Sequence, residues 1–390
     1  MGGANFALIE LIKNLKDAGN NVFVVVLYSG CPVDIELKKM GISTFPCFFG
    51  WWQQPEYWPK TLKLVFRFIH WLQWISVLRI SRFVRKNRIQ IIHSNSSVID
   101  IGAQVACKTN CRHVWHFREF GRADYRLEYM YPRERINDYI SKYSDMVIFI
   151  SKALQESYAD LAKKCHNIMI YDGIAVMSEK EKNTAGLQRY LLTENKRCPY
   201  SFLVTGNISP GKNQKLVLEA VDCLIHKMNM DKQSFEVHFA GAETALQESK
   251  DYGILLRKYV KDHELSNVVF HGFVRDMNQL REDIDAEIIP SVSEAYGRVT
   301  LEAMMTGDLV IASDSGSNPE LLQDNQNGLL FKSNDAEDLA QKMAYAMKHS
   351  CNEHRKHALE YVYAIHTRDD ACRKVQEVYS QICDRDEESE

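Results

Sequence analysis

Residues 290–320, PSVSEAYGRVTLEAMMTGDLVIASDSGSNPE, constrain the fold more than any other stretch of this chain. An apolar segment ends before Gly297, an amphipathic segment follows it, and a β-branched run, LVIA, comes after Gly307. This order predicts a strand, a glycine turn, a helix that begins near Arg298, and a second strand. Strands that alternate with helices are typical of parallel α/β sheets.

Two glutamates frame the predicted turn. Glu294 precedes Gly297, and Glu302 lies a turn or more into the helix. The start of a helix leaves backbone N–H groups unpaired, so the amides around Tyr296, Gly297 and Arg298 are suited to an anion such as a phosphate. Carboxylates accept hydrogen bonds from hydroxyl groups. The pattern predicts a site for an anionic, polyhydroxylated ligand; the alternative is one surface acid and one acid that solubilises the helix.

This stretch resembles the signature of glycosyltransferase family 4, the retaining nucleotide-sugar enzymes of GT-B fold. The resemblance extends over most of the chain. It rests on Glu294 and Glu302, which are separated by seven residues, and on the motif residues that follow them: Ala303, Met304, Gly307, Ser313, Gly316, Pro319 and Glu320. It implies an α/β protein with two Rossmann-like, doubly wound parallel-sheet domains that face a cleft.

Length and composition are compatible with this architecture. A chain of 390 residues that is 45% hydrophobic and 25% charged is long enough for two globular domains. The net charge of −3 gives no basic footprint for a nucleic-acid partner. The ten cysteines include no C-x-x-C pair, which predicts reduced thiols and no zinc site. The sequence shows no signal-peptide pattern, and residues 68–78 are too short to span a bilayer, so we expect a cytoplasmic protein that is at most peripheral to a membrane.

The predicted organisation has five parts. They are an acceptor-side N-terminal domain at 1–175, a polar linker at 176–198, a nucleotide-sugar-binding domain at 199–366, a helix at 367–383 that crosses back to the first domain, and an acidic tail at 384–390. In family 4 a glycine turn, here Gly2 and Gly3, follows a first strand and faces the donor phosphate. Because that turn opens this sequence, we expect the N-terminal domain to lack its usual first strand.

Two segments of the first domain leave alternatives open. Residues 45–60, FPCFFGWWQQPEYWPK, are dense in aromatic residues and predict a loop, which either forms a lip for the acceptor or anchors the next helix. Residues 60–88 predict one long helix with basic residues among apolar and aromatic ones. Such a helix either lies on an anionic membrane surface or packs its apolar side on the sheet.

A histidine follows the predicted strand HVWHF. His116 lies near the carboxyl end of that strand with Arg118 two residues further on, which is where open α/β sheets bind ligands. A lone histidine is usually structural. By resemblance, however, His116 corresponds to the histidine that family 4 enzymes place against the donor sugar.

The second domain opens with an apolar strand and a glycine-rich turn from Gly206 to Gly211. Backbone amides of such a turn, together with the Lys212 ammonium, are suited to a diphosphate. Family 4 often has Gly-Arg where this chain has Gly206 and Asn207, so the missing cation falls to Lys212 and Arg298. The turn formed by His271, Gly272 and Phe273 resembles the family loop whose backbone contacts the nucleotide base.

The resemblance implies a retaining, metal-independent hexosyltransferase with no cofactor beyond its nucleotide-sugar co-substrate. The acceptor is expected to be a lipid-linked saccharide in the synthesis of a bacterial capsule, O-antigen or exopolysaccharide. Lys212 and the amides near Gly297 would stabilise the leaving nucleoside diphosphate. Glu294 would bind the sugar hydroxyls, Glu302 the ribose, and His116 the sugar near its reacting carbon. The predicted donor-binding set is Gly2, Gly3, Gly206, Asn207, Lys212, His271, Gly272, Phe273, Glu294, Tyr296, Gly297, Arg298 and Glu302.

Two other functions fit parts of the sequence. A non-catalytic GT-B partner subunit agrees with the missing first strand and with Asn207. A sugar-nucleotide epimerase shares the fold but lacks the paired-glutamate motif. A dinucleotide oxidoreductase is disfavoured because no strand leads into G-x-G-x-x-G.

Overall fold

The computed structural model of the chain describes residues 3–175, 198–365 and 367–384. These residues divide into two compact units. Unit 1 comprises residues 1–173 and 368–390, and unit 2 comprises residues 174–367. Gly2, nearly all of the predicted linker and most of the predicted acidic tail lie outside the described residues.

Unit 2 is built on one parallel sheet with the strand order β11-β10-β9-β12-β13-β14. Its strands are β9 (Tyr200–Thr205), β10 (Phe235–Ala240), β11 (Val268–Gly272), β12 (Ala286–Ile289), β13 (Leu309–Ser313) and β14 (Leu329–Phe331). Near-continuous apolar runs such as FLV in β9 and LVIA in β13 are typical of parallel strands that are buried on both faces. The order reverses between β9 and β12, and open sheets bind ligands at such a switch point.

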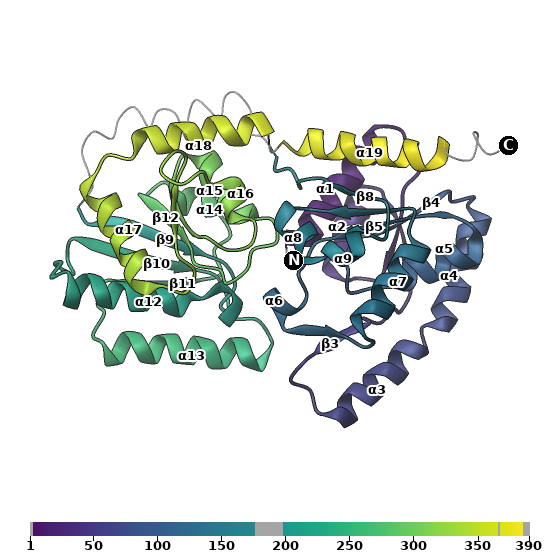
Figure 1. Ribbon diagram of the computed structural model, residues 1–390, viewed down its shortest axis with the longest axis horizontal. Coiled ribbons are helices and arrows are strands. Elements are labelled where there is room, and N and C mark those ends of the chain that lie inside the picture. Colours follow the sequence, from purple (N-terminus) through teal and green to yellow (C-terminus); the bar gives the residue numbers. More distant parts are fainter. Residues whose placement is uncertain (1–2, 176–197, 366, 385–390) are drawn as a thin grey trace. The chain divides into compact units, whose positions relative to one another are not determined.

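Helices cover both faces of this sheet, which makes unit 2 doubly wound as predicted (Figure 1). One face carries α12 (Gln214–Asp222), the π-helical turn η2 (Cys223–Lys227), α13 (Gln247–Asp262) and α17 (Ala336–Lys348). The other carries α14 (Met277–Arg281), α15 (Arg298–Thr306), α16 (Asn318–Leu321) and α18 (Asn352–Ile365). The predicted order of strand, turn, helix and strand is confirmed: β12 ends at Ile289, directly before residues 290–320, and α15 and β13 follow within them.

Unit 1 contains two separate parallel sheets. One pairs β1 (Phe23–Val26) with β2 (Ser43–Pro46), and the other has the order β4 (Ile91–Ser94), β5 (Arg112–Phe117), β7 (Met146–Phe149), β8 (Asn167–Met169). Within the described residues no strand joins β1 to β4. Each of those two strands fully buries one residue, whereas β7 buries all four. The interruption agrees with the prediction of a missing first strand.

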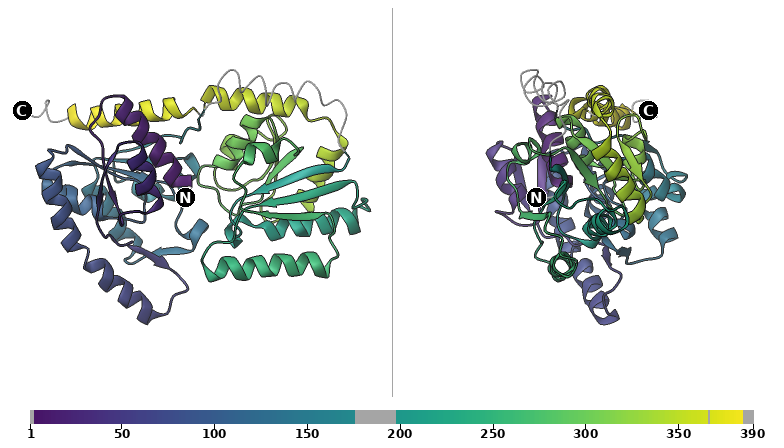
Figure 2. Two further views of the ribbon diagram at one scale, coloured as in Figure 1. Left: turned by 180° about the vertical axis from the view of Figure 1, so that it is seen from behind. Right: turned by 90° about the vertical axis from the view of Figure 1, so that its left-hand side faces the viewer.

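The helices of unit 1 surround these sheets. They are α1 (Gly3–Asp17), α2 (Pro32–Lys39), α3 (Lys60–Trp71), α4 (Trp74–Lys86), α5 (Ile101–Thr109), α6 (Arg122–Tyr125), α7 (Arg133–Tyr143), α8 (Lys152–Ser157), α9 (Ala159–Ala162) and the C-terminal α19 (Arg368–Asp384). Helix α19 lies beside α1 in both views (Figures 1 and 2). Leu11 and Leu15 of α1 share a core with Val375 and Val378 of α19. The end of the chain therefore completes unit 1.

The single helix predicted for residues 60–88 is wrong, because the chain bends at Leu72 and Gln73 between α3 and α4. The Gln73 side chain is buried, donates to Asp100 (Nε2 to Oδ1, 2.8 Å) and accepts from the Gly50 amide (3.3 Å). A buried amide must keep its hydrogen-bond partners, and these contacts hold the bend in place. No glycine or proline marks the position, so the sequence pattern gave no signal of it.

The loop predicted for residues 45–60 is also only partly right. It includes the antiparallel strand β3 (Gln53–Pro55), which pairs with β6 (Leu127–Tyr129). Trp52 is buried and stacks on Trp115 with ring centroids 5.3 Å apart, whereas Trp51 is exposed. Both tryptophans precede β3, so their different exposure comes from the packing of the loop and not from a strand. None of the helices in the described part of the chain combines the length and apolar character needed to cross a bilayer.

Candidate functional site

Two of the predicted catalytic residues meet at the switch point of unit 2. Lys212 ends η1 (Pro210–Lys212), the turn that follows β9, and Glu294 lies in the loop that follows β12. The Lys212 ammonium donates to the Glu294 carboxylate (Nζ to Oε2, 2.7 Å). The side chains remain 32% and 17% exposed, respectively, so both are accessible to a ligand. The structure therefore brings together a cation and a carboxylate that are 82 residues apart in sequence.

Backbone contacts hold the two loops together. The Val292 amide donates to the Gly211 carbonyl (3.0 Å), which ties the loop before Glu294 to the glycine turn. Gln214, at the start of α12, donates to the Asn207 carbonyl (3.0 Å) and is almost fully buried. Asn207 itself is exposed. Sequence reasoning missed Gln214, although a glutamine directly after a phosphate-type turn is a signal that can be searched for.

Gly316, in the motif G-x-x-P-E, fixes the backbone of Glu294. The Gly316 φ is +58°, and a Cβ atom there would lie 2.3 Å from the Glu294 carbonyl oxygen. The next amide, of Ser317, donates to that same oxygen (2.8 Å). Only glycine combines this backbone conformation with so close an approach. The motif glycine is thus a positioning residue for the carboxylate.

We expect Gly316→Ala to weaken both stability and transfer. The left-handed backbone and the clash predict a loss of about 1–3 kcal/mol in the free energy of unfolding. Because the added methyl group displaces the Glu294 backbone, the kcat of transfer should fall even in the folded fraction. Urea unfolding and initial-rate kinetics measure these two effects. Gly19→Ala, where φ is +85° but no atom lies within 4 Å of the added Cβ, separates backbone strain from displacement of Glu294.

The helix predicted near Arg298 begins as expected at Gly297, which has φ +83°. Arg298 approaches Glu302 one turn later (Nη2 to Oε1, 3.7 Å), and Arg281 approaches the other oxygen (Nη2 to Oε2, 3.9 Å). Tyr296 is buried, so its side chain is part of the packing rather than of an open surface. Glu302 is therefore surrounded by guanidinium groups and remains partly exposed.

Arg281 is a buried cation that the sequence analysis missed. It pairs with the buried Glu287 of β12 (Nε to Oε2, 2.9 Å). Burial lowers the pKa of the Arg281 guanidinium, but the charge and hydrogen bond of Glu287, together with the charges of Asp308 and Glu302, raise that pKa by more. The cation is thus kept charged beside Glu302. An isolated arginine in a short helix carries no sequence signal, because only the fold brings it to β12.

The predicted base-binding turn lies at the end of β11. His271 contacts His238 (Nε2 to Nδ1, 3.0 Å), and the Gly272 carbonyl accepts from the Gly241 amide (2.8 Å). The Phe273 ring is 78% exposed. Its open aromatic face is suited to stacking on a planar ring.

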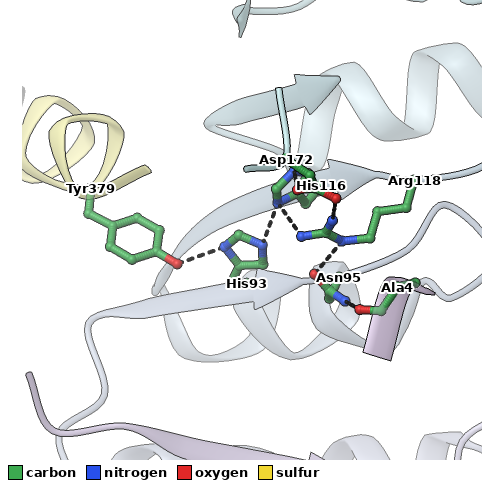
Figure 3. Close-up of polar contacts among 7 residues, drawn as sticks. All are labelled: Ala4, His93, Asn95, His116, Arg118, Asp172 and Tyr379. Carbon is green, nitrogen blue, oxygen red and sulfur yellow. Dashed lines mark hydrogen bonds and ion pairs between the residues drawn. The ribbon is translucent and has the colours of Figure 1, made fainter. Parts of the chain in front are cut away.

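His116 lies in unit 1, within a chain of polar contacts that runs from β4 and β5 to α19 (Figure 3). The Arg118 guanidinium donates to Asn95 (Nε to Oδ1, 2.7 Å) and pairs with Asp172. It also approaches His116 (Nη2 to Nδ1, 3.3 Å). His93 lies between His116 (Nε2 to Nδ1, 3.3 Å) and the Tyr379 hydroxyl (Nδ1 to Oη, 2.7 Å).

These contacts assign the tautomer of His116. A guanidinium donates only, so the His116 Nδ1 next to Arg118 must be the acceptor. The ring proton of neutral His116 is then on Nε2. By the same reasoning His93 donates from Nε2 and accepts from Tyr379 at Nδ1. The His116 Nε2 is buried, has no hydrogen-bond partner among the described residues, and lies 4.0 Å from Asp172 Oδ1.

Burial, followed by the charge of Arg118, lowers the pKa of His116 well below its ordinary value. The imidazole is therefore neutral near pH 7 and presents one unused N–H donor. A small cavity of about 20 Å³ adjoins it, with Asp172, Glu10 of α1 and Arg368 of α19 in its wall. A buried donor without a partner is costly unless a ligand or water completes it.

Of the glycine pair predicted to face the donor, Gly3 is the exposed first residue of α1.

Three histidines of unit 1 predict that acid destabilises it. Removal from water is the main cause that lowers the pKa of His93 to about 3, that of His113 to about 4, and that of His116 well below 6.5. Below pH 6.5 the unfolded chain therefore binds protons that the folded chain does not. The free energy of unfolding should fall as pH drops from 7 towards 4, by up to about 1.4 kcal/mol per pH unit for each histidine.

Asp124 has the opposite effect on the pH dependence of stability, because burial raises its pKa to about 6. Below that pH the folded chain binds a proton at Asp124 that the unfolded chain binds less well, which offsets roughly one of the histidine protons. All six tryptophans of the chain lie in unit 1, so tryptophan fluorescence during urea unfolding reports on this unit. A free energy of unfolding that is equal or higher at pH 5 than at pH 7 would contradict the assignment of neutral, enclosed histidines.

Comparison with known proteins identifies the family. A family model described as Glycosyltransferase Family 4 matches residues 1–176, and one described as glycosyl transferases group 1 matches residues 194–364. The chain is a family 4 glycosyltransferase. The recognition made from the paired glutamates is confirmed.

Curated relatives of this family 4 chain include two bacterial transferases. The putative glycosyltransferase EpsD of Bacillus subtilis is 25% identical over 314 residues, which are 76% of this chain and 77% of EpsD. The serotype-specific mannosyltransferase WbdA of Escherichia coli is 26% identical over 251 residues, which are 62% of this chain and 27% of WbdA.

Solved structures confirm the GT-B fold. HepE of Anabaena, in complex with UDP and glucose, has a TM-score of 0.73 at 19% identity and covers 97% of this chain and 96% of HepE. A glycosyltransferase from Rickettsia africae has a TM-score of 0.74 at 18% identity and covers 98% and 95% of the two chains.

In the described part of this family 4 chain, no three His, Cys, Asp or Glu side chains gather in a way that could hold a metal ion.

Proposed function

We propose that this family 4 glycosyltransferase transfers a hexose-type sugar, with retention of configuration, from a nucleotide sugar to a lipid-linked saccharide in bacterial surface polysaccharide synthesis. The observation that carries the proposal is the pair formed by Lys212 and Glu294 at the switch point of unit 2. A cation for a diphosphate directly beside a carboxylate for hydroxyl groups matches the two chemical parts of a nucleotide sugar.

The leaving group is stabilised electrostatically in this proposal. Lys212 donates to the diphosphate, and the amides at the start of α15 near Gly297 face its developing negative charge. The bond between the anomeric carbon and the phosphate oxygen breaks as the acceptor oxygen bonds to that carbon from the same face. A phosphate oxygen takes the proton of the acceptor hydroxyl. The reaction then needs no protein nucleophile and no metal.

The sugar and the ribose are bound by carboxylates. When Lys212 turns to the diphosphate, Glu294 is released to accept hydrogen bonds from the sugar hydroxyls. Glu302 accepts from the ribose hydroxyls, and Arg281 and Arg298 keep that carboxylate charged and oriented. From unit 1, His116 donates through Nε2 to a donor sugar hydroxyl near the reacting carbon. Its neutral state suits it to donate without repelling the positive charge that develops on the sugar.

The relatives support the substrate class by their names. EpsD is named a putative glycosyltransferase, WbdA a serotype-specific mannosyltransferase, and structures of HepE contain UDP or UDP-glucose. These names justify testing hexose donors and a uridine nucleotide first.

A non-catalytic partner subunit remains the second candidate. It is favoured by Asn207, which stands where the family often has arginine. Such a subunit would have no use for a transferable sugar.

Thermal unfolding with uridine, guanosine and adenosine diphosphates and their sugars, without added metal, tests the proposal. A ligand at about one hundred times its dissociation constant adds roughly 2.7 kcal/mol to the stability of the native state. We expect one base to stabilise the protein and the corresponding nucleotide sugar to serve in transfer assays. A folded protein that none of these ligands stabilises would overturn the donor assignment and favour the partner subunit.

A further inference from the structure

Helix α3 has its polar side towards the protein. Lys63 donates to Glu128 (Nζ to Oε1, 2.6 Å), and Arg67 donates to the Met130 carbonyl (Nη2 to O, 2.8 Å). His70 lies 3.0 Å from Asp100 (Nε2 to Oδ1). The charged and polar side chains thus attach the helix to the rest of unit 1.

The apolar side of α3 faces solvent. No residue of this helix is buried, and Leu64, Phe68 and Trp71 are 63%, 59% and 62% exposed. The exposed apolar side chains on α3 and at the bend are Leu62, Leu64, Val65, Phe68, Ile69, Trp71, Leu72, Trp74 and Ile75. We call this set the α3 surface. Figure 1 shows α3 at the periphery of unit 1.

This arrangement reverses the usual one. A helix at the surface of a globular protein packs its apolar side on the core, as α4 does with Val77, Ile80 and Val84. The spacing of Leu64, Phe68 and Trp71 forms one continuous row on α3. A contiguous apolar surface of this kind in contact with water marks an interaction site. Of the two alternatives for residues 60–88, packing of the apolar side on the sheet therefore applies to α4 but not to α3.

The charge around the α3 surface indicates what covers it. Residues 57–99 contain no Asp or Glu and eight basic residues, Lys60, Lys63, Arg67, Arg79, Arg82, Arg85, Lys86 and Arg88, in a chain whose net charge is −3. A second copy of this chain would bring a like-charged surface against it. An anionic lipid surface instead complements the cations and accepts the apolar row, with tryptophans at the depth where they are usually found.

We propose that the α3 surface binds the boundary between headgroups and acyl chains of a membrane that contains anionic lipids. The helix lies in the plane of that surface, with the Leu64, Phe68 and Trp71 row at the edge of the acyl region. The exposed Lys60, one turn before Leu64, lies among the headgroups, whereas Lys63 and Arg67 keep their contacts with unit 1. This inference deepens the proposed function by naming where a lipid-linked acceptor is met. Membrane binding itself requires neither a donor nor transfer.

Vesicle flotation without any nucleotide tests the inference. The full chain should bind vesicles of phosphatidylcholine with phosphatidylglycerol about tenfold or more tightly than vesicles of phosphatidylcholine alone, and added salt should reduce the difference. The triple variant Leu64→Ser, Phe68→Ser, Trp71→Ser should lose about tenfold or more of this binding. The matched control is Leu246→Ser with Ile254→Ser, which removes similarly exposed apolar side chains from unit 2 and should leave binding unchanged.

Two outcomes would overturn the inference. One is equal binding by the triple variant and the wild type. The other is no binding to either vesicle, together with a concentration-dependent dimer that the triple variant abolishes, which would make a second copy the occupant. The thermal shift given by the nucleoside diphosphate should be the same in the triple variant and the wild type. A missing shift in both proteins would count against the donor site and leave the vesicle result intact.

Discussion

Glu294→Gln is expected to lower kcat/KM for sugar transfer by about 100-fold or more while the affinity for the nucleoside diphosphate stays within a few fold of the wild type. The carboxylate accepts charged hydrogen bonds worth about 1.5–3 kcal/mol each, and the amide of glutamine replaces them poorly. The Lys212 ammonium, 2.7 Å from Glu294 in this structure, is meanwhile released for the diphosphate. Calorimetric titration and initial-rate kinetics measure the two quantities.

Lys212→Ala should show a different pattern from Glu294→Gln. Removing the ammonium should weaken binding of both the nucleoside diphosphate and the nucleotide sugar by about tenfold to 100-fold, because one charge-assisted contact to phosphate is lost. Lys215→Ala is the matched control, since Lys215 lies in the first turn of α12 and pairs with Glu219. If Lys212→Ala and Glu294→Gln have identical effects on diphosphate binding, the division of roles is wrong.

The second large effect is expected at His116. His116→Asn should lower kcat by roughly 10-fold to 100-fold, because the Asn amide ends near the position of Nδ1 and leaves the sugar hydroxyl without its donor. His116→Gln places an N–H group near the position of Nε2 and should retain most of the activity. Nitrogen NMR of the wild type should show the His116 proton on Nε2.

Circular dichroism and thermal unfolding establish whether both His116 variants fold. Equal losses of kcat in folded Asn and Gln variants would mean that His116 acts by packing rather than by donation. A wild-type imidazole protonated on Nδ1 would contradict the assignment made from Arg118.

Local patterns were enough to predict much of unit 2. The alternation of apolar strands with glycine turns located β9, β12, β13 and α15, and the family motif selected Lys212 and Glu294 in advance. Gly316 was part of that motif, but its role needed coordinates, because its contact with the Glu294 backbone depends on how two loops pack. Arg281 was missed for the same reason, whereas Gln214 follows a glycine turn and could have been found from its position.

Unit 1 was harder to predict from its sequence. The segment 60–88 has continuous helical periodicity, yet the buried Gln73 bends it, and the contacts of Lys63 and Arg67 turn its apolar side outwards. Periodicity locates an apolar side but does not say which direction it faces. His93 and Tyr379 lie 286 residues apart, so only the packing of α19 on unit 1 reveals their contact.

The most direct test of the proposed chemistry is proton NMR of the transfer product at its anomeric position. The protein is incubated with the nucleotide sugar that stabilises it and a saccharide acceptor. We predict one new glycosidic linkage with the anomeric configuration of the donor, which is absent when Glu294→Gln replaces the wild type. An inverted configuration would contradict the retaining mechanism. No product from folded protein that binds the donor, tested with a range of saccharide acceptors, would contradict the assignment as a catalyst.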